Sequence, residues 1–236
     1  EGVIVDGVLA DGTVGVLVEI NCETDFVARD DSFRSFASKV ATAAISYIPK
    51  TQDELLAVSL DSGESITDAR NSLVGRIGEN ITVRRFAILE TTKGRISSYI
   101  HGQRIGVLVS VENGSEQLSR DLAMHIAASS PVGIDESAIP DETVRIESEI
   151  FLAQAIESGK TGSIAEKIVE GRLKKFFREH TLLGQPFVKN PNITVRELLK
   201  SQEARVTAMI RYERGEGLEK RSDDFVGEVM AQASGN

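Results

Sequence analysis

Gly159-Lys160-Thr161 matches the end of a phosphate-binding loop, in which backbone amides and a Lys hold nucleotide phosphates. That loop also needs a Gly five positions earlier, where this chain has Gln154, and a strand in front of it. The residues before Gly159 instead carry apolar side chains at helical spacing. We therefore interpret the triplet as the tip of a helical hairpin.

The side chains that could bind a transition metal or transfer protons are scattered along the chain. The histidines have no ligand spacing to one another or to the single cysteine, which predicts no metal site. Asp30-Asp31 and Asp223-Asp224 each precede a predicted helix and are interpreted as helix caps. The sequence disfavours an enzyme, and we expect no catalytic residue and no cofactor. The residues considered for a metal are Cys22, His101, His125 and His180.

A basic cluster on one predicted helix is the only local argument for RNA binding. Phe176 and Phe177 of the same stretch belong to its apolar stripe, so the charges are interpreted as its solvated face. The chain has 27 Lys and Arg against 36 Asp and Glu, and its net charge of −9 disfavours a phosphate-backbone partner. A protein or a small molecule is favoured instead. The basic residues are Arg172, Lys174, Lys175 and Arg178.

The most informative segment is 21–31, because one large apolar side chain, Phe26, lies there in a polar, acid-rich connection. Only 5% of the residues are aromatic and none is Trp, so an aromatic side chain outside the predicted core needs a reason. Two interpretations are open at this point. The ring packs under its own helix, or it fits a pocket of a partner.

An internal repeat predicts the elements that position this segment. Residues 15–20, Gly-Val-Leu-Val-Glu-Ile, recur at 106–111 as Gly-Val-Leu-Val-Ser-Val, which indicates a duplication. The pattern of each copy predicts a β-hairpin followed by an amphipathic helix and a third strand. The expected hairpins cover 3–20 and 95–111, the helices 32–44 and 115–129, and the third strands 81–86 and 206–212. A further helical stretch is expected within 61–78, with Gly78 as its C-cap.

The two copies differ where Phe26 lies. The offset between them falls from 91 residues in the hairpins to 86 in the helices, so the first copy is five residues longer here. The second copy makes the same connection with residues 112–115 and no aromatic side chain. Because one copy of the scaffold does without this Phe, the comparison strengthens the partner-binding interpretation.

The second copy carries an insertion that predicts an antiparallel helical hairpin. Helical runs at 141–157 and 163–179 are joined by a flexible tip at 158–162. The apolar stripes of the two runs can pack on each other, and they could also pair with a second copy of the chain.

The fold class expected is α+β, with two duplicated subdomains that each contain a three-stranded antiparallel sheet and packed helices. A chain of 236 residues with 41% hydrophobic and 27% charged residues can bury such cores. The expected boundaries are 1–92 for the first subdomain, 93–140 with 188–222 for the second, 141–187 for the hairpin, and 223–236 for a C-terminal helix.

The compartment expected is the cytoplasm or an organellar matrix. A single cysteine excludes an internal disulfide, no apolar run approaches the length of a membrane span, and the first residues lack a signal-peptide pattern. Because there is no initiator Met and residue 3 already has strand character, we expect that an N-terminal segment precedes this sequence.

Six segments resemble the elongation factor Ts family, whose members act on the GTPase elongation factor Tu. The resemblance runs in order from residue 1 to about 233, although the family's N-terminal ubiquitin-associated-like domain has no counterpart here. The segments are 18–29 with Glu-Thr-Asp-Phe-Val-Ala-Arg at its end, 77–81, 98–109, 123–129, 165–172 and 184–188.

This resemblance implies a coiled-coil hairpin that dimerises in some members, and a C-terminal helix, here 224–231, that packs on the partner. It implies that an exchange element inserts between helices of the GTPase domain near its magnesium site. The residues that match this element are Thr24, Asp25, Phe26 and Val27. Further partner contacts are implied for Ile77, Gly78, His101 and Val188, whereas His125 is expected to be structural.

We therefore expect a factor that binds elongation factor Tu with GDP and promotes GDP release, without acting as an enzyme. The alternative is a non-exchanging structural partner of the GTPase in a larger assembly, such as a phage replicase or a ribosome-associated form. A self-contained hairpin is favoured, with a homodimer through the hairpin as the alternative, and we expect no membrane association and no direct contact with nucleic acid.

Overall fold

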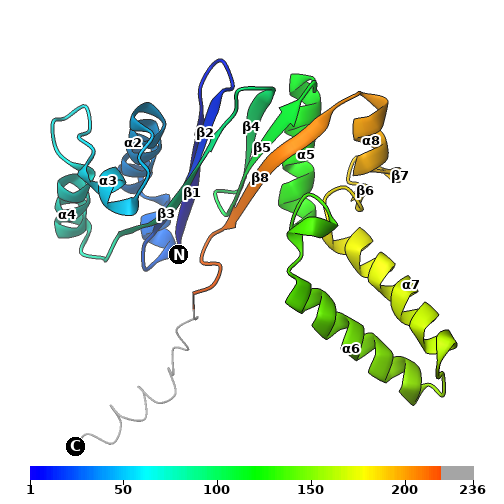
Figure 1. The fold of residues 1–236 in the computed structure, drawn as a ribbon. Helices are drawn as coiled ribbons and strands as arrows, with labels where there is room; N and C mark the ends of the chain where they lie inside the picture. The colour runs from blue at the N-terminus through cyan, green and yellow to red at the C-terminus, as the bar shows by residue number, and fades with distance from the viewer. Residues whose placement is uncertain (219–236) are drawn as a thin grey trace, which may run out of the picture.

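The computed structural model describes residues 1–218, which form an α+β fold around two three-stranded antiparallel sheets (Figure 1). The first sheet has the order β1-β2-β3 and the second the order β4-β5-β8. Both hairpins and both third strands predicted from the sequence are present. Their bounds are β1 (Gly2–Val8), β2 (Val14–Asn21), β3 (Thr82–Glu90), β4 (Arg95–His101), β5 (Ile105–Glu112) and β8 (Arg205–Glu213).

The two sheets pack face to face through a small apolar cluster that both supply. Its buried members are Ile4 and Leu17 from the first sheet and Ile96 and Leu108 from the second. Two backbone hydrogen bonds join the hairpins reciprocally: Ile4 N–H donates to Gln103 O at 2.8 Å, and Ile96 N–H donates to Gly12 O at 2.8 Å. Each hairpin turn is thus bonded to the first strand of the other hairpin.

The glycine that opens each repeated segment lies at this junction. A Cβ added to Gly15 would lie 2.7 Å from Ile96 Cγ2, and one added to Gly106 would lie 2.5 Å from Ile4 Cγ2. Both contacts are shorter than packed atoms tolerate, so a side chain at either position would push the sheets apart. The close approach of the sheets therefore explains why both copies of the repeat begin with Gly.

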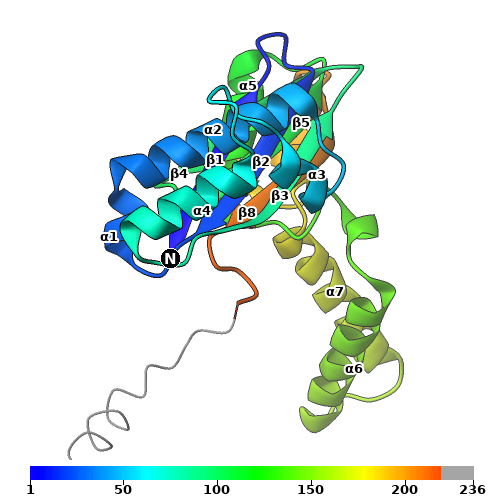
Figure 2. The ribbon, with the colours of Figure 1, turned by 90° about the vertical axis from the view of Figure 1, so that its left-hand side faces the viewer.

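Helices cover the outer face of each sheet (Figures 1 and 2). On the first sheet lie α2 (Asp31–Tyr47), α3 (Gln52–Ala57) and α4 (Ile66–Ile77), and on the second lies α5 (Glu116–Ser129). Asp30 caps α2, as predicted, by accepting hydrogen bonds from the backbone N–H groups of Ser32 and Phe33 at 2.8 and 3.2 Å. Gly78 ends α4 with a φ of 82°, which confirms the predicted C-cap.

Two helices, α6 (Asp141–Glu157) and α7 (Ser163–His180), extend away from the sheets and pack on each other (Figure 1). Gly159-Lys160-Thr161 lies in the turn between them, so the phosphate-loop interpretation is excluded by position as well as by spacing. Several apolar side chains remain exposed along the pair. They are Ile146, Ile150, Leu152, Ile156 and Ile164.

The elements around these helices were not predicted. The short 3-10 helix η1 (Glu136–Ala138) precedes α6, and the chain returns to the second sheet through β6 (Pro186–Phe187), β7 (Asn190–Thr194) and α8 (Val195–Ser201). The C-terminal helix expected at 224–231 lies outside the described residues. Among the helices described, none is long and apolar enough to cross a membrane.

A buried ion cluster fixes the end of β8 against the first sheet. Glu19 is fully buried and accepts hydrogen bonds from Arg84 Nη1 at 2.9 Å and from Arg85 Nε at 2.6 Å. The backbone N–H of Gly215 donates to the same carboxylate at 2.8 Å. Burial alone would raise the pKa of Glu19, but this N–H and the two guanidinium groups lower it below its ordinary value.

Candidate partner-binding site

The segment that the sequence suggested to be an irregular connection contains a short helix, α1 (Asp25–Arg29). Thr24 is its N-cap, and the Thr24 hydroxyl oxygen accepts a hydrogen bond from the backbone N–H of Val27 at 3.3 Å. Asp25 in the first turn and Arg29 in the last form an ion pair at 2.9 Å, and both charges complement the helix dipole. The extra residues of the first repeat therefore form α1, since β5 runs almost directly into α5 in the second.

The side chains of α1 face two environments. Val27 and Ala28 are buried in the core beneath α2, whereas the ring of Phe26 is 80% exposed. The first interpretation from the sequence, a ring packed under its own helix, is therefore wrong. Phe26 projects from the surface, and none of the aromatic pairs in the described part of the chain includes it.

A second segment is attached to this helix by the carboxylate of Glu79. Thr24 donates its backbone N–H to Glu79 Oε2 at 3.1 Å and its hydroxyl to Glu79 Oε1 at 2.7 Å. Glu79 follows Ile77 and Gly78, which were predicted as a separate contact with the partner. The structure thus brings residues 24–27 and 77–78 together. Glu79 was not predicted as a site residue, because its partner lies 55 positions away in the sequence.

Cys22 lies beside α1 but has the properties of a structural residue. It is buried, and its Sγ donates a hydrogen bond to Thr24 O at 3.3 Å. Burial raises the pKa of the Cys22 thiol to about 11, so the thiol stays protonated near neutral pH. This cysteine therefore supports the backbone before α1 and is not a nucleophile.

The other two predicted contact residues belong to the second sheet and its insertions. His101 ends β4 and is exposed, and its ring stacks on Tyr99 with 6.3 Å between ring centroids. Val188 follows β6 and is 45% exposed. In the described part of the chain no hydrogen bond joins either residue to α1 or to the end of α4.

His125 is buried on α5 and organises the backbone before Val188. Its Nδ1 accepts a hydrogen bond from the Val188 N–H at 3.1 Å, and its Nε2 lies 3.1 Å from Gln185 Oε1. These partners fit a neutral ring with its proton on Nε2. Burial lowers the pKa of His125, although the bond to Gln185 opposes this shift. The structural role expected for His125 is confirmed by this burial.

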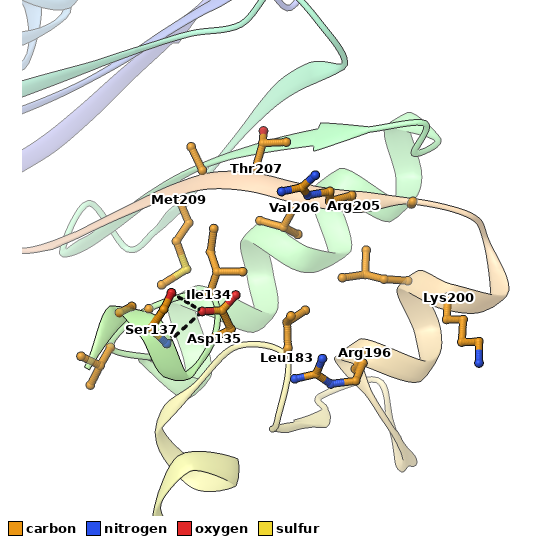
Figure 3. Close-up of a pocket in the computed structure, with 16 residues that line it drawn as sticks. Ile134, Asp135, Ser137, Leu183, Arg196, Lys200, Arg205, Val206, Thr207 and Met209 are labelled. Atoms are coloured by element: carbon orange, nitrogen blue, oxygen red, sulfur yellow. Dashed lines mark hydrogen bonds between the residues drawn. The ribbon is translucent and has the colours of Figure 1, made fainter. Parts of the chain in front are cut away.

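A cavity of about 680 Å³ opens on the side of the second sheet that faces away from the first sheet. It lies between the loop at 132–138, α8 and β8 (Figure 3). Asp135 in this loop accepts hydrogen bonds from the N–H and the hydroxyl of Ser137 at 3.0 and 2.6 Å. None of the predicted site residues lines the cavity. Within residues 1–218 there is also no group of three His, Cys, Asp or Glu side chains that could hold a metal ion.

Comparisons with known proteins agree with the fold and with the segments described above. The family model described as Elongation factor TS matches residues 23–216. An elongation factor Ts from Legionella pneumophila (strain Paris) is 50% identical over 98% of this chain and 79% of its own length. The protein of the same name from Thioalkalivibrio sulfidiphilus is 49% identical over 100% of this chain and 80% of its own length. The protein of the same name from Halorhodospira halophila is 53% identical over 98% of this chain and 79% of its own length.

The class of protein that these matches define is the translation elongation factors. Within this class, the chain belongs to the elongation factor Ts family.

Proposed function

We propose that this protein binds the GTPase elongation factor Tu in its GDP-bound form and promotes the release of GDP. The element that acts is α1, with Asp25 and Phe26 entering the GTPase domain near its magnesium site. The observation that carries the proposal is the ring of Phe26, which is 80% exposed on a helix whose other face is buried. This role makes and breaks no covalent bond.

The mechanism is a conversion of binding energy into nucleotide release. GDP is held by magnesium and by backbone amides that surround its phosphates, and this arrangement must open before GDP leaves. A buried aromatic anchor can supply roughly 2 kcal/mol or more of binding free energy. Each 1.4 kcal/mol of coupling weakens nucleotide binding about tenfold, and by linkage the nucleotide weakens the factor's binding equally. GTP can therefore displace the factor once exchange is complete.

The remaining predicted contacts extend this surface. Ile77 and Gly78 are joined to α1 through Glu79, which supports a single contact region formed by residues 24–27 and 77–78. His101 and Val188 are exposed on the second sheet unit and would make separate contacts with the same partner. Contacts on both units would hold the GTPase while Phe26 enters it.

The experiment is the release of a fluorescent GDP analogue from purified elongation factor Tu, with wild type and with Phe26→Ala. The matched control is Tyr47→Ala, because Tyr47 is also aromatic and is 63% exposed on α2. We expect wild type and Tyr47→Ala to accelerate release and Phe26→Ala to be slower by about tenfold or more.

A folded Phe26→Ala variant that releases GDP as fast as wild type would refute the insertion mechanism. If wild type binds elongation factor Tu without changing the release rate, the alternative of a non-exchanging structural partner in a larger assembly takes the place of exchange. RNA binding by the basic face of α7 would instead require salt-sensitive affinity for RNA in the absence of the GTPase.

We also infer that the two sheet units are duplicated subdomains with boundaries 1–92 and 93–140 with 188–222. The reciprocal bonds of Ile4 and Ile96, and the equivalent glycines Gly15 and Gly106, support this inference. The insertion at 141–187 would be a coiled-coil hairpin, whose exposed apolar side chains support homodimerisation. Ile156→Glu should then shift a dimer to monomer in sedimentation, and an unchanged mass would exclude this interface.

A further inference from the structure

We propose that Glu79 is a positioning residue that holds the exposed ring of Phe26 in place, an inference that rests on the exchange function proposed above. By this inference Glu79 itself does not contact the partner. It acts through Thr24, whose backbone N–H and hydroxyl both donate to its carboxylate, at 3.1 and 2.7 Å.

The Thr24 hydroxyl links Glu79 to the first turn of α1. A hydroxyl has one proton to donate and lone pairs to accept with. Because the proton of Thr24 points to Glu79, a lone pair is left for the N–H of Val27 at 3.3 Å. The charged acceptor therefore fixes the rotation of the hydroxyl, and with it the N-cap of α1.

Helix α1 needs such support because it is only five residues long. An isolated helix of this length is unstable in water, since nucleation costs more than so few hydrogen bonds return. The buried Val27 and Ala28 hold one face of α1, but the ring of Phe26 is 80% exposed, so packing contributes little to fixing it. The direction of the ring is therefore set by the backbone of α1, which begins at the Thr24 cap.

The position of Glu79 is determined by the end of α4. Gly78 has a φ of 82°, and its N–H donates to Val74 O at 2.8 Å, which turns the chain sharply after the helix. This turn places the next residue, Glu79, beside Thr24. The two segments that face the partner are thus locked to each other before binding, which lowers the entropic cost of binding.

This arrangement predicts a different defect from the loss of Phe26 itself. Without Glu79, α1 must be ordered when the complex forms, so more factor is needed for half-maximal GDP release. At saturating factor the ring still enters its pocket, so the maximal rate stays near that of wild type. Phe26→Ala, in contrast, lowers the maximal rate because the inserted group is absent.

The test compares Glu79→Ala and Glu79→Gln with Glu64→Ala, an exposed control on a loop. Two quantities are measured: amide hydrogen exchange at Val27 without any partner, and GDP release from elongation factor Tu as a function of factor concentration. For Glu79→Ala we expect exchange at Val27 to be about tenfold faster and the half-saturating concentration to rise about tenfold. Glu79→Gln keeps one acceptor oxygen, so its values should lie between those of wild type and Glu79→Ala, and Glu64→Ala should match wild type.

Glu79→Ala with wild-type exchange at Val27, or with an unchanged half-saturating concentration, would overturn the proposal. A loss of maximal rate that follows a general fall in thermal stability would also overturn it, because it would make Glu79 merely structural. The amide exchange needs no GTPase, so it decides whether Glu79 orders α1 even if Phe26→Ala shows the exchange function to be wrong.

Discussion

Phe26 and Val27 are neighbours in the chain, but their side chains point in opposite directions. Phe26 projects from the surface and is 80% exposed, whereas Val27 points into the protein and is 7% exposed. The helical turn that joins them separates their roles, because Val27 contributes to the core and Phe26 does not. A side chain that lies outside the core of its own fold is free to serve a contact with another molecule. Truncating each side chain to Ala should therefore change the free energy of unfolding by different amounts.

Val27→Ala should lower the free energy of unfolding by about 2 kcal/mol, since it removes two buried methyl groups. Phe26→Ala should change it by less than about 0.5 kcal/mol, because the ring has few contacts to lose. Urea denaturation of the two variants gives both values. A loss of about 2 kcal/mol or more for Phe26→Ala would mean that the ring packs on its own protein after all.

The cluster around Glu19 predicts a stability that depends on acid. Because the pKa of Glu19 is lowered in the folded state, the stability it adds is present above about pH 4.5 and is lost as the pH falls through the lower folded value. Glu19→Gln should cost roughly 3 kcal/mol at neutral pH, as expected when a buried ion pair loses one partner.

The control for this prediction is Glu64→Gln, since Glu64 is exposed on a loop. Thermal unfolding between pH 7 and pH 3 should show a steeper loss of stability for wild type and the control than for Glu19→Gln. Equal slopes for all three proteins would contradict the role assigned to Glu19.

His125 predicts a second pH dependence, near neutrality. Its pKa is lowered by burial, so the neutral ring adds stability above about pH 6.5 that is lost as the pH falls through the lower folded value. Protonation would also put a hydrogen on Nδ1 and break the bond from the Val188 N–H. The melting temperature of wild type should therefore fall between pH 7 and pH 5.5.

In His125→Gln this fall should be smaller, whereas His180→Gln, which changes an exposed histidine, should keep it. The protection factor of the Val188 amide, which corrects the exchange rate for its intrinsic pH dependence, reports the loss of this bond directly and should be smaller at the lower pH. A Val188 amide that is equally protected at pH 7 and pH 5.5 would show that His125 does not titrate in this range.

The sequence predicted the regular elements well, because long apolar periodicities leave few alternatives. The bounds of α6, Asp141–Glu157, agree with those predicted, and α7 is longer by one residue. The repeat identified both hairpins, since the same alternation of buried and exposed side chains was present twice. A Thr194…Glu197 capping box, present in the structure, could also have indicated α8.

The site itself could be predicted only in part. Five residues of α1 are too few to show a helical period, and what makes them helical is the Thr24 cap and the burial of Val27. The exposure of Phe26 depends on tertiary structure, so the sequence could not decide whether the ring packs under its own helix or fits a pocket of a partner. Glu79 was missed because its role depends on a contact between distant segments, which a single sequence does not reveal.

The central claim is that Phe26 couples binding of this protein to loss of nucleotide, and the most direct measurement is a pair of dissociation constants. Equilibrium binding of wild type, Phe26→Ala and Tyr47→Ala is compared for nucleotide-free and for GDP-bound elongation factor Tu. The ratio of the two constants gives the coupling free energy. We predict that this ratio falls by about tenfold or more in Phe26→Ala and is unchanged in Tyr47→Ala. If Phe26→Ala weakens both constants equally and leaves the ratio as in wild type, Phe26 is only an anchor and the account is contradicted.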